Sequence, residues 1–286
     1  MRSPEWTIRM RGLDLLSPAL ILLIVAFLAP IIMLLPTSLH SYLPGVGIGS
    51  DYSVANYVKF VTDGYYLEII GRTFLLGLMV TLLTLVTGYP VAYFLARSTS
   101  PWRPWVTLLI VFPLLLNLVV RTFGWITLLA NNGLINDFLR WLGVIDTPLK
   151  LMFNFTGLLI GLTHIYLPFM ILILIPAIEA IPRDLEDASR TLGSNRWSTF
   201  RHVVIPMSTP GILSGSILVF VLAISALVTP RLLGGPTYQV VSTLIYDQFL
   251  QLLDWPAGAA MSWLLTVMVI ILIAISTRIA KRWGAQ

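Results

Sequence analysis

Residues 182–206 read PRDLEDASRTLGSNRWSTFRHVVIP, a polar segment between two long apolar runs. Residues 151–178 before it and residues 203–230, which begin at its end, contain no Lys, Arg, Asp or Glu. A helix needs roughly 20 apolar residues to cross the hydrocarbon core of a bilayer, which is about 30 Å thick. The segment is therefore predicted to be a loop between two membrane-spanning helices.

The first half of this loop has the pattern of a short helix. Pro182 and Asp184 suit a helix start, where acidic side chains interact favourably with the helix dipole. Gly193 predicts a left-handed turn that ends the helix. We expect Ser194 to cap a second short helix, which Pro206 ends. One apolar face is formed by Leu185, Ala188 and Leu192. This helix either docks on a partner protein or lies on the bilayer surface.

Four further runs without charged residues, at 15–39, 73–96, 104–120 and 255–277, predict the remaining spans. The third is long enough only if Arg121 lies within the span or at its rim. The first is too long for the core of a cleavable signal peptide, which has about 7–15 residues. The sequence thus predicts an all-α integral membrane protein with one transmembrane domain over residues 1–286. Its six helices are expected near residues 14–37, 68–96, 104–130, 154–181, 207–228 and 257–279.

The composition excludes several classes of protein. Of the 286 residues, 57% are hydrophobic and only 11% are charged. Soluble domains average roughly 25% charged residues, so a soluble enzyme, a disordered protein and a nucleic-acid binder are all excluded. The chain has no cysteine, which also excludes disulfides and thiolate metal sites.

The basic residues predict the orientation in the membrane. With six spans, both termini lie on the same side as residues 182–206. That side holds 12 of the 18 Lys and Arg residues, the other side holds five, and Arg121 is the remaining one. Basic residues are enriched in cytoplasmic loops. Both termini are therefore expected in the cytoplasm.

The chain lacks the motifs of an ATPase or a zinc enzyme. None of its three lysines follows a glycine, so there is no Gly-Lys-Ser/Thr phosphate-binding loop. Its three histidines form no His-x-x-x-His pair. We expect no catalytic site, no metal site and no cofactor in this chain.

Two outer segments and several small-residue stripes have recognisable patterns. Residues 38–66 look ordered, and residues 131–150 predict an amphipathic interfacial helix that Gly143 ends. Small residues at helical spacing allow helices to pack closely, and the alternative role is the wall of a water-filled path. Four spans carry such a stripe: Gly77, Thr81, Thr84 and Gly88; Gly157, Gly161, His164 and Pro168; Gly211 and Gly215; and Gly258, Ser262 and Thr266.

Residues 182–206 resemble the cytoplasmic loop of type I ABC importer permeases. The pattern of that family is Glu-Ala-Ala, three residues, Gly, nine residues, then Ile-x-Leu-Pro. Here Ala188, Gly193 and Pro206 match it in identity and spacing. The conservative departures are Asp187, Ser189, Val203 and Ile205. The number of spans and the place of the loop between the fourth and fifth also match the family.

The resemblance implies that this loop is a coupling helix, which docks on an ATPase subunit. The residues expected at that contact are Glu186, Asp187, Ala188, Ser189, Arg190, Leu192, Gly193 and Pro206. The implied partners are a second permease subunit, two ATPase subunits that bind ATP and Mg²⁺, and an external binding protein. The implied setting is the inner membrane of a bacterium, and the implied mechanism is alternating access.

Two outer segments, residues 136–148 and 254–260, resemble the spermidine/putrescine branch of these permeases. That resemblance implies a polyamine or a related amine as the solute, with an opine or another amino-acid derivative as the alternative. A stand-alone secondary transporter is a further alternative. It would require inverted repeats and a buried coupling carboxylate, and Glu179 is the only acid near the interior of a span.

The third span holds the strongest candidates for a solute path. Asn117, Arg121 and Trp125 are four residues apart and would share one helical face. A charged side chain within a span normally faces the bundle interior or water, so Arg121 either lines the path, snorkels outward, or pairs with a carboxylate such as Glu68. Aromatic side chains favour an amine, whereas Arg121 would repel one. The full candidate set is Asn117, Arg121, Trp125, His164, Tyr246, Asp254 and Trp255.

Overall fold

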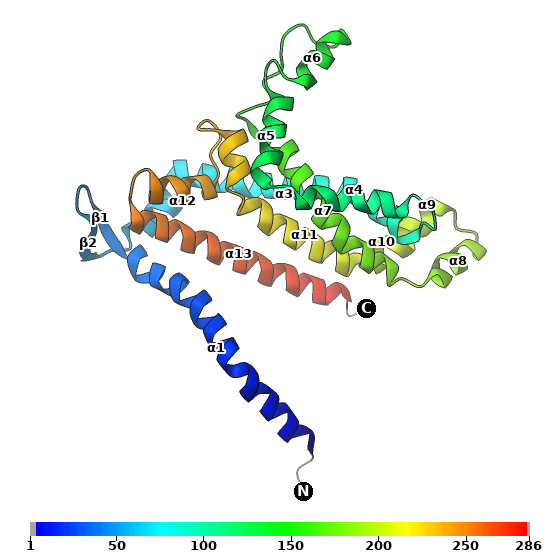
Figure 1. The fold of residues 1–286 in the computed structure, drawn as a ribbon, viewed down its shortest axis with the longest axis horizontal. Coiled ribbons are helices and arrows are strands. Elements are labelled where there is room, and N and C mark those ends of the chain that lie inside the picture. Colours follow the sequence, from blue (N-terminus) through cyan, green and yellow to red (C-terminus); the bar gives the residue numbers. More distant parts are fainter. Residues whose placement is uncertain (1–3, 285–286) are drawn as a thin grey trace. The chain divides into compact units, whose positions relative to one another are not determined.

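A computed structural model describes residues 4–284 of the chain, with side chains over residues 16–278. Helices dominate it (Figure 1). The helices are α1 (Pro4–Ser38), α2 (Ala55–Thr62), α3 (Gly64–Arg97), α4 (Arg103–Leu115), α5 (Leu118–Leu129), α6 (Leu134–Trp141), α7 (Phe155–Glu179), α8 (Arg183–Thr191), α9 (Arg196–Thr199), α10 (Ile205–Met207), α11 (Thr209–Ile224), α12 (Val241–Leu250) and α13 (Trp255–Gly284). Two strands, β1 (His40–Leu43) and β2 (Gly47–Tyr52), and two π-helical turns, η1 (Phe200–Val204) and η2 (Pro230–Gly234), complete the structure.

The chain forms two compact units. One comprises the residues up to Thr62 together with Asp247–Thr266, and the other comprises Asp63–Tyr246 together with the residues from Val267 onward. In the first unit β1 and β2 form an antiparallel hairpin in which Tyr42 lies opposite Ile48. The expectation that residues 38–66 are ordered is therefore confirmed.

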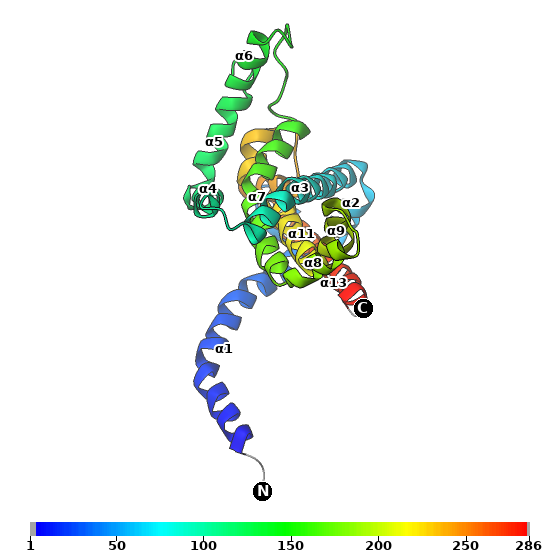
Figure 2. The same ribbon diagram turned by 90° about the vertical axis from the view of Figure 1, so that its right-hand side faces the viewer.

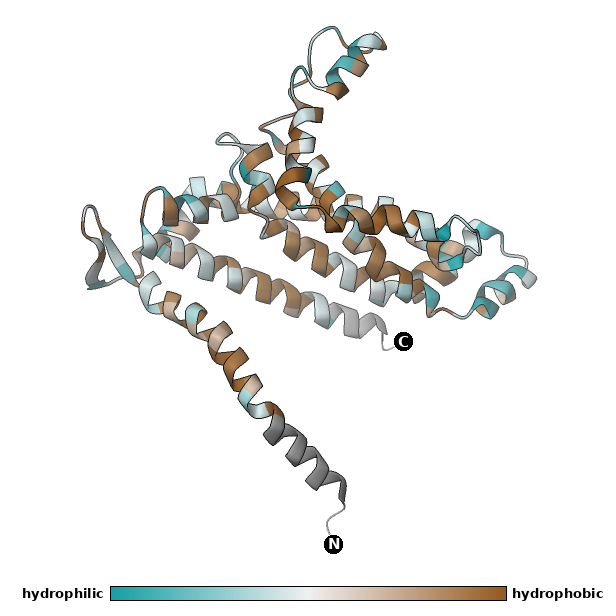
Figure 3. Cartoon of the chain, in the orientation of Figure 1, coloured by the Kyte–Doolittle hydropathy of each residue, from teal (hydrophilic) through white to brown (hydrophobic). Residues whose placement is uncertain are grey.

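Length and apolar composition qualify five helical stretches as membrane spans. A sixth span results if the pair Arg196–Met207 and Thr209–Ile224, bent by 66°, is counted as one. This agrees with the prediction of an all-α membrane protein with six spans. Figure 3 shows apolar residues along α4, α7 and α11, and polar residues on α8 and α9. The five single stretches are Leu16–Ser38, Gly64–Arg97, Leu118–Trp141, Phe155–Glu179 and Trp255–Arg278.

Helices α3, α7 and α11 lie side by side and form the core of the second unit (Figures 1 and 2). The small-residue stripes are the reason they approach closely. A Cβ atom on Gly211 would lie 2.2 Å from Cβ of Ala177, so only glycine fits there. The hydroxyls of Thr81 and Thr84 donate to carbonyls of their own helix, Gly77 and Val80. Close packing is therefore confirmed as the role of these two stripes.

The third predicted span, residues 104–130, is wrong as a single helix. Helix α4 ends before Leu116, whose backbone is extended at φ −81° and ψ 142°. Asn117 then caps α5, because its side chain accepts the N–H of Val119 at 2.8 Å. In Figure 2 the axis of α4 points toward the viewer whereas α5 runs upward. A proline in the last turn of α4, Pro113, precedes this break.

The fifth predicted span, residues 207–228, is shorter than expected. Its straight part is α11, and the chain bends by 66° at Ser208. Pro210 explains the bend, because it has no N–H to bond the carbonyl of Pro206 four residues earlier. Pro206 was expected to end the second short helix. It lies instead inside α10, and the helical path ends two residues later at Ser208.

The amphipathic helix predicted within residues 131–150 is confirmed as α6. Gly143 follows it with φ +68°, a left-handed conformation. Asn136 is fully buried, and its side chain bonds the carbonyls of Ala130 and Leu149 and the N–H of Leu149. One amide thus ties both ends of this segment together.

Candidate functional site: a buried anchor under α8 and a polar cluster on α5 and α7

Helix α8 ends as the sequence predicts. Gly193 has φ +91°, and its N–H donates to the carbonyl of Arg190 at 3.0 Å. The predicted cap of the second helix is one residue off. Asn195, not Ser194, caps α9, because its side chain accepts the N–H of Ser198 at 2.7 Å.

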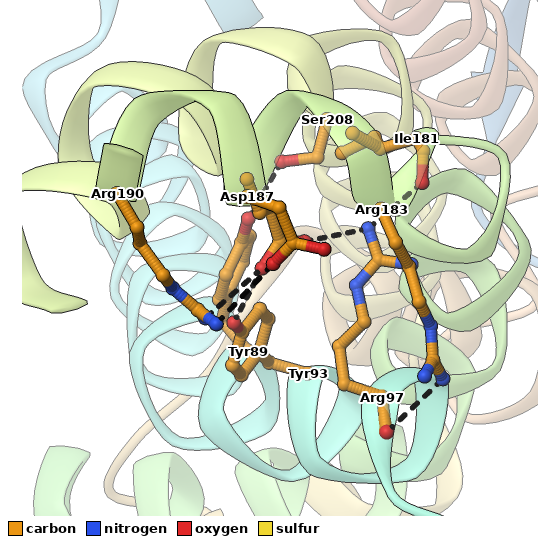
Figure 4. A network of polar contacts seen from close by, with 9 residues as sticks. Tyr89, Tyr93, Arg97, Ile181, Arg183, Asp187, Arg190 and Ser208 are labelled. Atoms are coloured by element: carbon orange, nitrogen blue, oxygen red, sulfur yellow. Dashed lines mark hydrogen bonds and ion pairs between the residues drawn. The ribbon is translucent and has the colours of Figure 1, made fainter. Parts of the chain in front are cut away.

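The carboxylate of Glu186 is the centre of this site. The residue is 5% exposed, although it is acidic and belongs to a polar helix. Its Oε1 lies 2.8 Å from Nη2 of Arg97, and the hydroxyl of Tyr93 donates to its Oε2 at 3.1 Å. Nη2 of Arg190 lies 3.9 Å from the same Oε2 (Figure 4). Glu186 therefore anchors α8 to the end of α3.

The end of α3 also holds the two ends of the loop. Nη2 of Arg97 donates to the carbonyl of Ile181 at 2.9 Å, and Nη2 of Arg183 donates to the carbonyl of Arg97 at 3.2 Å. At the far end of the loop, the hydroxyl of Tyr89 lies 2.6 Å from Oγ of Ser208 (Figure 4). One face of α3 thus fixes the loop at its start, in α8 and at its end.

The anchor leaves an apolar face of α8 without cover. Leu185 is exposed and Leu192 is 87% exposed, so the predicted apolar stripe points away from the bundle. This is the reverse of an ordinary packed helix, because the acid is inside and the leucines are outside. The other expected docking residues that are exposed are Asp187, Ala188, Arg190, Gly193 and Pro206. Ser189 is half-buried and bonds Thr199 at 3.1 Å.

Glu186 faces α3 within this chain. It was expected among the residues that contact an ATPase subunit, but its carboxylate is turned inward and paired. Its partners Tyr93 and Arg97, and Tyr89, which bonds Ser208, were not predicted from the sequence. Tyr89, Tyr93 and Arg97 are spaced by four residues, and that polar stripe at the end of an apolar span was the signal that could have found them.

Three of the predicted path residues lie together on α5 and α7. The indole Nε1–H of Trp125 donates to Nδ1 of His164 at 3.1 Å, and the two rings meet edge to face at 5.2 Å. Arg121 precedes Trp125 by four residues on α5, about one helical turn. We call Arg121, Trp125 and His164 the α5–α7 cluster.

Arg121 is not paired with Glu68. Within the part of the chain that the structure describes, Nε and Nη1 of Arg121 are buried and have no hydrogen-bond partner. Glu68 instead pairs with Arg72 on its own helix. Arg121 therefore keeps unused hydrogen-bond donors inside the bundle.

The other predicted path residues have local roles. Asn117 caps α5, and its carbonyl accepts the N–H of Arg121 at 3.1 Å. The ring of Tyr246 lies under the guanidinium of Arg231, 4.9 Å from its centroid. In the first unit, Asp254 accepts the N–H of Ala257 at 2.9 Å, and Trp255 packs edge to face on Phe249. Among the described residues, no group of three His, Cys, Asp or Glu side chains is placed to hold a metal ion.

Comparison with known proteins identifies the family. Residues 85–283 match the family described as binding-protein-dependent transport system inner membrane component. The spermidine/putrescine transport system permease protein PotB of Escherichia coli K12 is 35% identical over 259 residues, which cover 91% of this chain and 94% of that protein. PotB of Haemophilus influenzae is 31% identical over 80% of both chains.

Solved structures show the same fold. A chain of a bacterial alginate ABC transporter, solved with an alginate-bound periplasmic protein, superposes with a TM-score of 0.79 at 18% identity. That match covers 97% of this chain and 95% of the other. A chain of the MetNI methionine ABC transporter superposes with a TM-score of 0.58 over 76% of this chain and 95% of the other, at 16% identity. The chain therefore belongs to the family of inner-membrane components of binding-protein-dependent transport systems, and it is a permease subunit of an ABC importer.

Proposed function

We propose that this permease moves a polyamine from an external binding protein into the cytoplasm by alternating access. The PotB relatives support the solute class. The observation that carries the coupling role is the inverted polarity of α8, which buries Glu186 and exposes Leu185 and Leu192. Such a helix is fixed from behind and offers apolar side chains to a partner.

The proposed assembly contains a second permease subunit, two ATPase subunits and the binding protein. The ATPase subunits bind ATP and Mg²⁺, since this chain has no Gly-Lys-Ser/Thr loop. The proposed setting is a bacterial inner membrane with both termini in the cytoplasm. The excess of basic residues on that side supports this orientation.

The anchor gives α8 a mechanical role in this cycle. When the ATPase subunits close on ATP, they pull α8 with them. The Glu186–Arg97 ion pair passes that displacement to α3. The hydrogen bonds Arg97–Ile181 and Tyr89–Ser208 hold the two ends of the loop on α3 at the same time. The energetic input is the difference in ATPase contacts between the inward-open and outward-open states.

A second candidate solute is an opine or another amino-acid derivative that carries a carboxylate. Arg121 favours it, because a guanidinium binds a carboxylate through two parallel hydrogen bonds and repels a polyamine cation. In this case Trp125 and His164 hold the rest of the solute beside Arg121.

The test is uptake into proteoliposomes that contain the complete transporter, with ATP inside and the binding protein outside. The solutes are radiolabelled spermidine, putrescine and an opine. We expect ATP-dependent uptake of a polyamine, and Arg121→Gln should not lower it. Arg140→Gln is the matched control, because Arg140 is an exposed arginine that pairs with Asp137.

Two outcomes contradict the proposal in different ways. Opine uptake without polyamine uptake, abolished by Arg121→Gln but not by Arg140→Gln, would replace the polyamine with a carboxylate-bearing solute. Uptake that persists without ATP and follows an ion gradient would instead contradict the ATP-driven mechanism.

A further inference from the structure

A deep groove opens beside the anchor, between α3, α9, η1 and α11. Its volume is about 880 Å³. One end is lined by Leu85, Val86 and Ile212, all apolar and within the spans. The other end is lined by Arg190, Arg196 and Trp197, all from the polar loop. We call it the α3–η1 groove.

The apolar end of the groove lies well inside the span. Val86 lies 11 residues before Arg97, the last residue of α3. At 1.5 Å per residue this places Val86 about 16 Å from the end of the helix. Half of a hydrocarbon core is about 15 Å. The apolar end of the groove therefore reaches roughly the middle of the membrane, whereas its basic end lies at the surface.

Arg196, one of the two arginines at the basic end, has no carboxylate partner in the described part of the chain. Among the residues that the structure describes, no carboxylate lies within ion-pair distance of Arg196, which is exposed. Arg190 lies 3.9 Å from Glu186 and 3.6 Å from Asp187, but its side chain is half exposed and its donors are not all used. The indole of Trp197 is exposed beside them, as is typical of tryptophan at a membrane interface.

We propose that the α3–η1 groove binds one anionic phospholipid. An acyl chain lies against Leu85, Val86 and Ile212, and the phosphate lies between Arg190 and Arg196. The charge of the basic end favours an anionic lipid over a zwitterionic one, because each basic side chain near the surface attracts an anionic headgroup. The position beside the anchor means that the lipid steadies α9 and η1 against α3. The site does not depend on which solute is transported.

The test is native mass spectrometry of the complete purified transporter, after delipidation and addition of phosphatidylglycerol or phosphatidylcholine with the same acyl chains. We expect phosphatidylglycerol to be retained in preference to phosphatidylcholine. Arg196→Gln should weaken its retention about fivefold, which corresponds to roughly 1 kcal/mol for one basic side chain. Arg196→Lys should retain it. Arg201→Gln is the matched control, because Arg201 is exposed on the same segment but does not line the groove.

A second variant tests the apolar end. Val86 is 67% exposed, so Val86→Trp places an indole in the groove without displacing the core. It should lower retention of phosphatidylglycerol while the unfolding temperature stays unchanged. Equal losses in Arg196→Gln and Arg201→Gln would overturn the proposal, because they would indicate general surface charge. Unchanged retention in Val86→Trp, or a crosslink from position 86 to a partner subunit in place of lipid, would also overturn it.

Discussion

Glu186→Ala removes one partner of a buried ion pair and leaves the other in place. The side chain of Arg97 is 13% exposed, and without the carboxylate its guanidinium keeps only the carbonyl of Ile181. Breaking a buried pair in this way costs about 3–5 kcal/mol. Glu186→Gln removes the charge but keeps an oxygen for the hydroxyl of Tyr93, so the expected loss is smaller than for Glu186→Ala.

The double variant Glu186→Met with Arg97→Met shows whether the loss of stability in Glu186→Ala comes from an unpaired charge or from lost packing. Replacing both members of a buried pair with apolar side chains is often neutral or stabilising. We therefore expect the double variant to be more stable than Glu186→Ala. Asp187→Asn is the matched control, because Asp187 is exposed and its pair with Arg190 contributes at most about 1 kcal/mol.

Thermal unfolding of the purified transporter measures the loss, and limited trypsin cleavage within residues 182–206 reports whether the loop has detached. In Glu186→Ala we expect a lower unfolding temperature, faster cleavage and ATP hydrolysis without uptake. If Glu186→Ala unfolds at the same temperature as Asp187→Asn, or if the double variant is the least stable of all, Glu186 does not anchor α8.

Three further substitutions test other parts of the structure. Gly193→Asp puts a side chain at φ +91°, which costs about 1–2 kcal/mol; uptake should fall while the protein remains in the membrane, and normal uptake would contradict the role of this turn. Gly211→Val places its Cβ 2.2 Å from that of Ala177 and should lower the unfolding temperature by overpacking, about 1–3 kcal/mol, with partial rescue by Ala177→Gly. Asn195→Cys should react with an impermeant thiol reagent only from the cytoplasmic side, and labelling of intact cells would reverse the proposed orientation.

The spans were predictable because bilayer thickness sets them. A charged side chain is costly in the hydrocarbon core, so runs without charge mark the helices directly. The turn at Gly193 and the helix α6 were predictable for local reasons, namely a left-handed glycine and an amphipathic period. These features depend on residues close together in the sequence.

The break between α4 and α5 shows that a long run without charged residues need not form one continuous helix. Residues 104–120 are apolar enough to form one helix, but Leu116 is extended and Asn117 caps a new helix. A side-chain cap satisfies an N–H group that would otherwise lack a partner within the membrane. Asparagine four residues after Pro113 is a local signal for such a break, and it outweighs the hydrophobic run.

The anchor was not predictable from the loop alone, because it joins residues 89 positions apart. Glu186 is buried only because Arg97 and Tyr93 meet it from α3. An isolated reading of the loop assigns its acids to the surface, and that assignment is correct for Asp187. Which of two neighbouring acids turns inward depends on the crossing of α3 and α8, which no periodicity within either helix encodes.

The rigidity of the bundle decides what a displaced α8 can do. Helix α3, which ends at Arg97, packs against α7 on its other face, where a Cβ on Gly88 would lie 3.2 Å from Ile171. Interiors packed this tightly transmit displacements instead of absorbing them. Helix α7 also carries His164, which holds Trp125 of α5. A pull on α8 that reaches Glu186 must therefore move α3 and α7 together, and the α5–α7 cluster moves with them unless the Trp125–His164 bond opens.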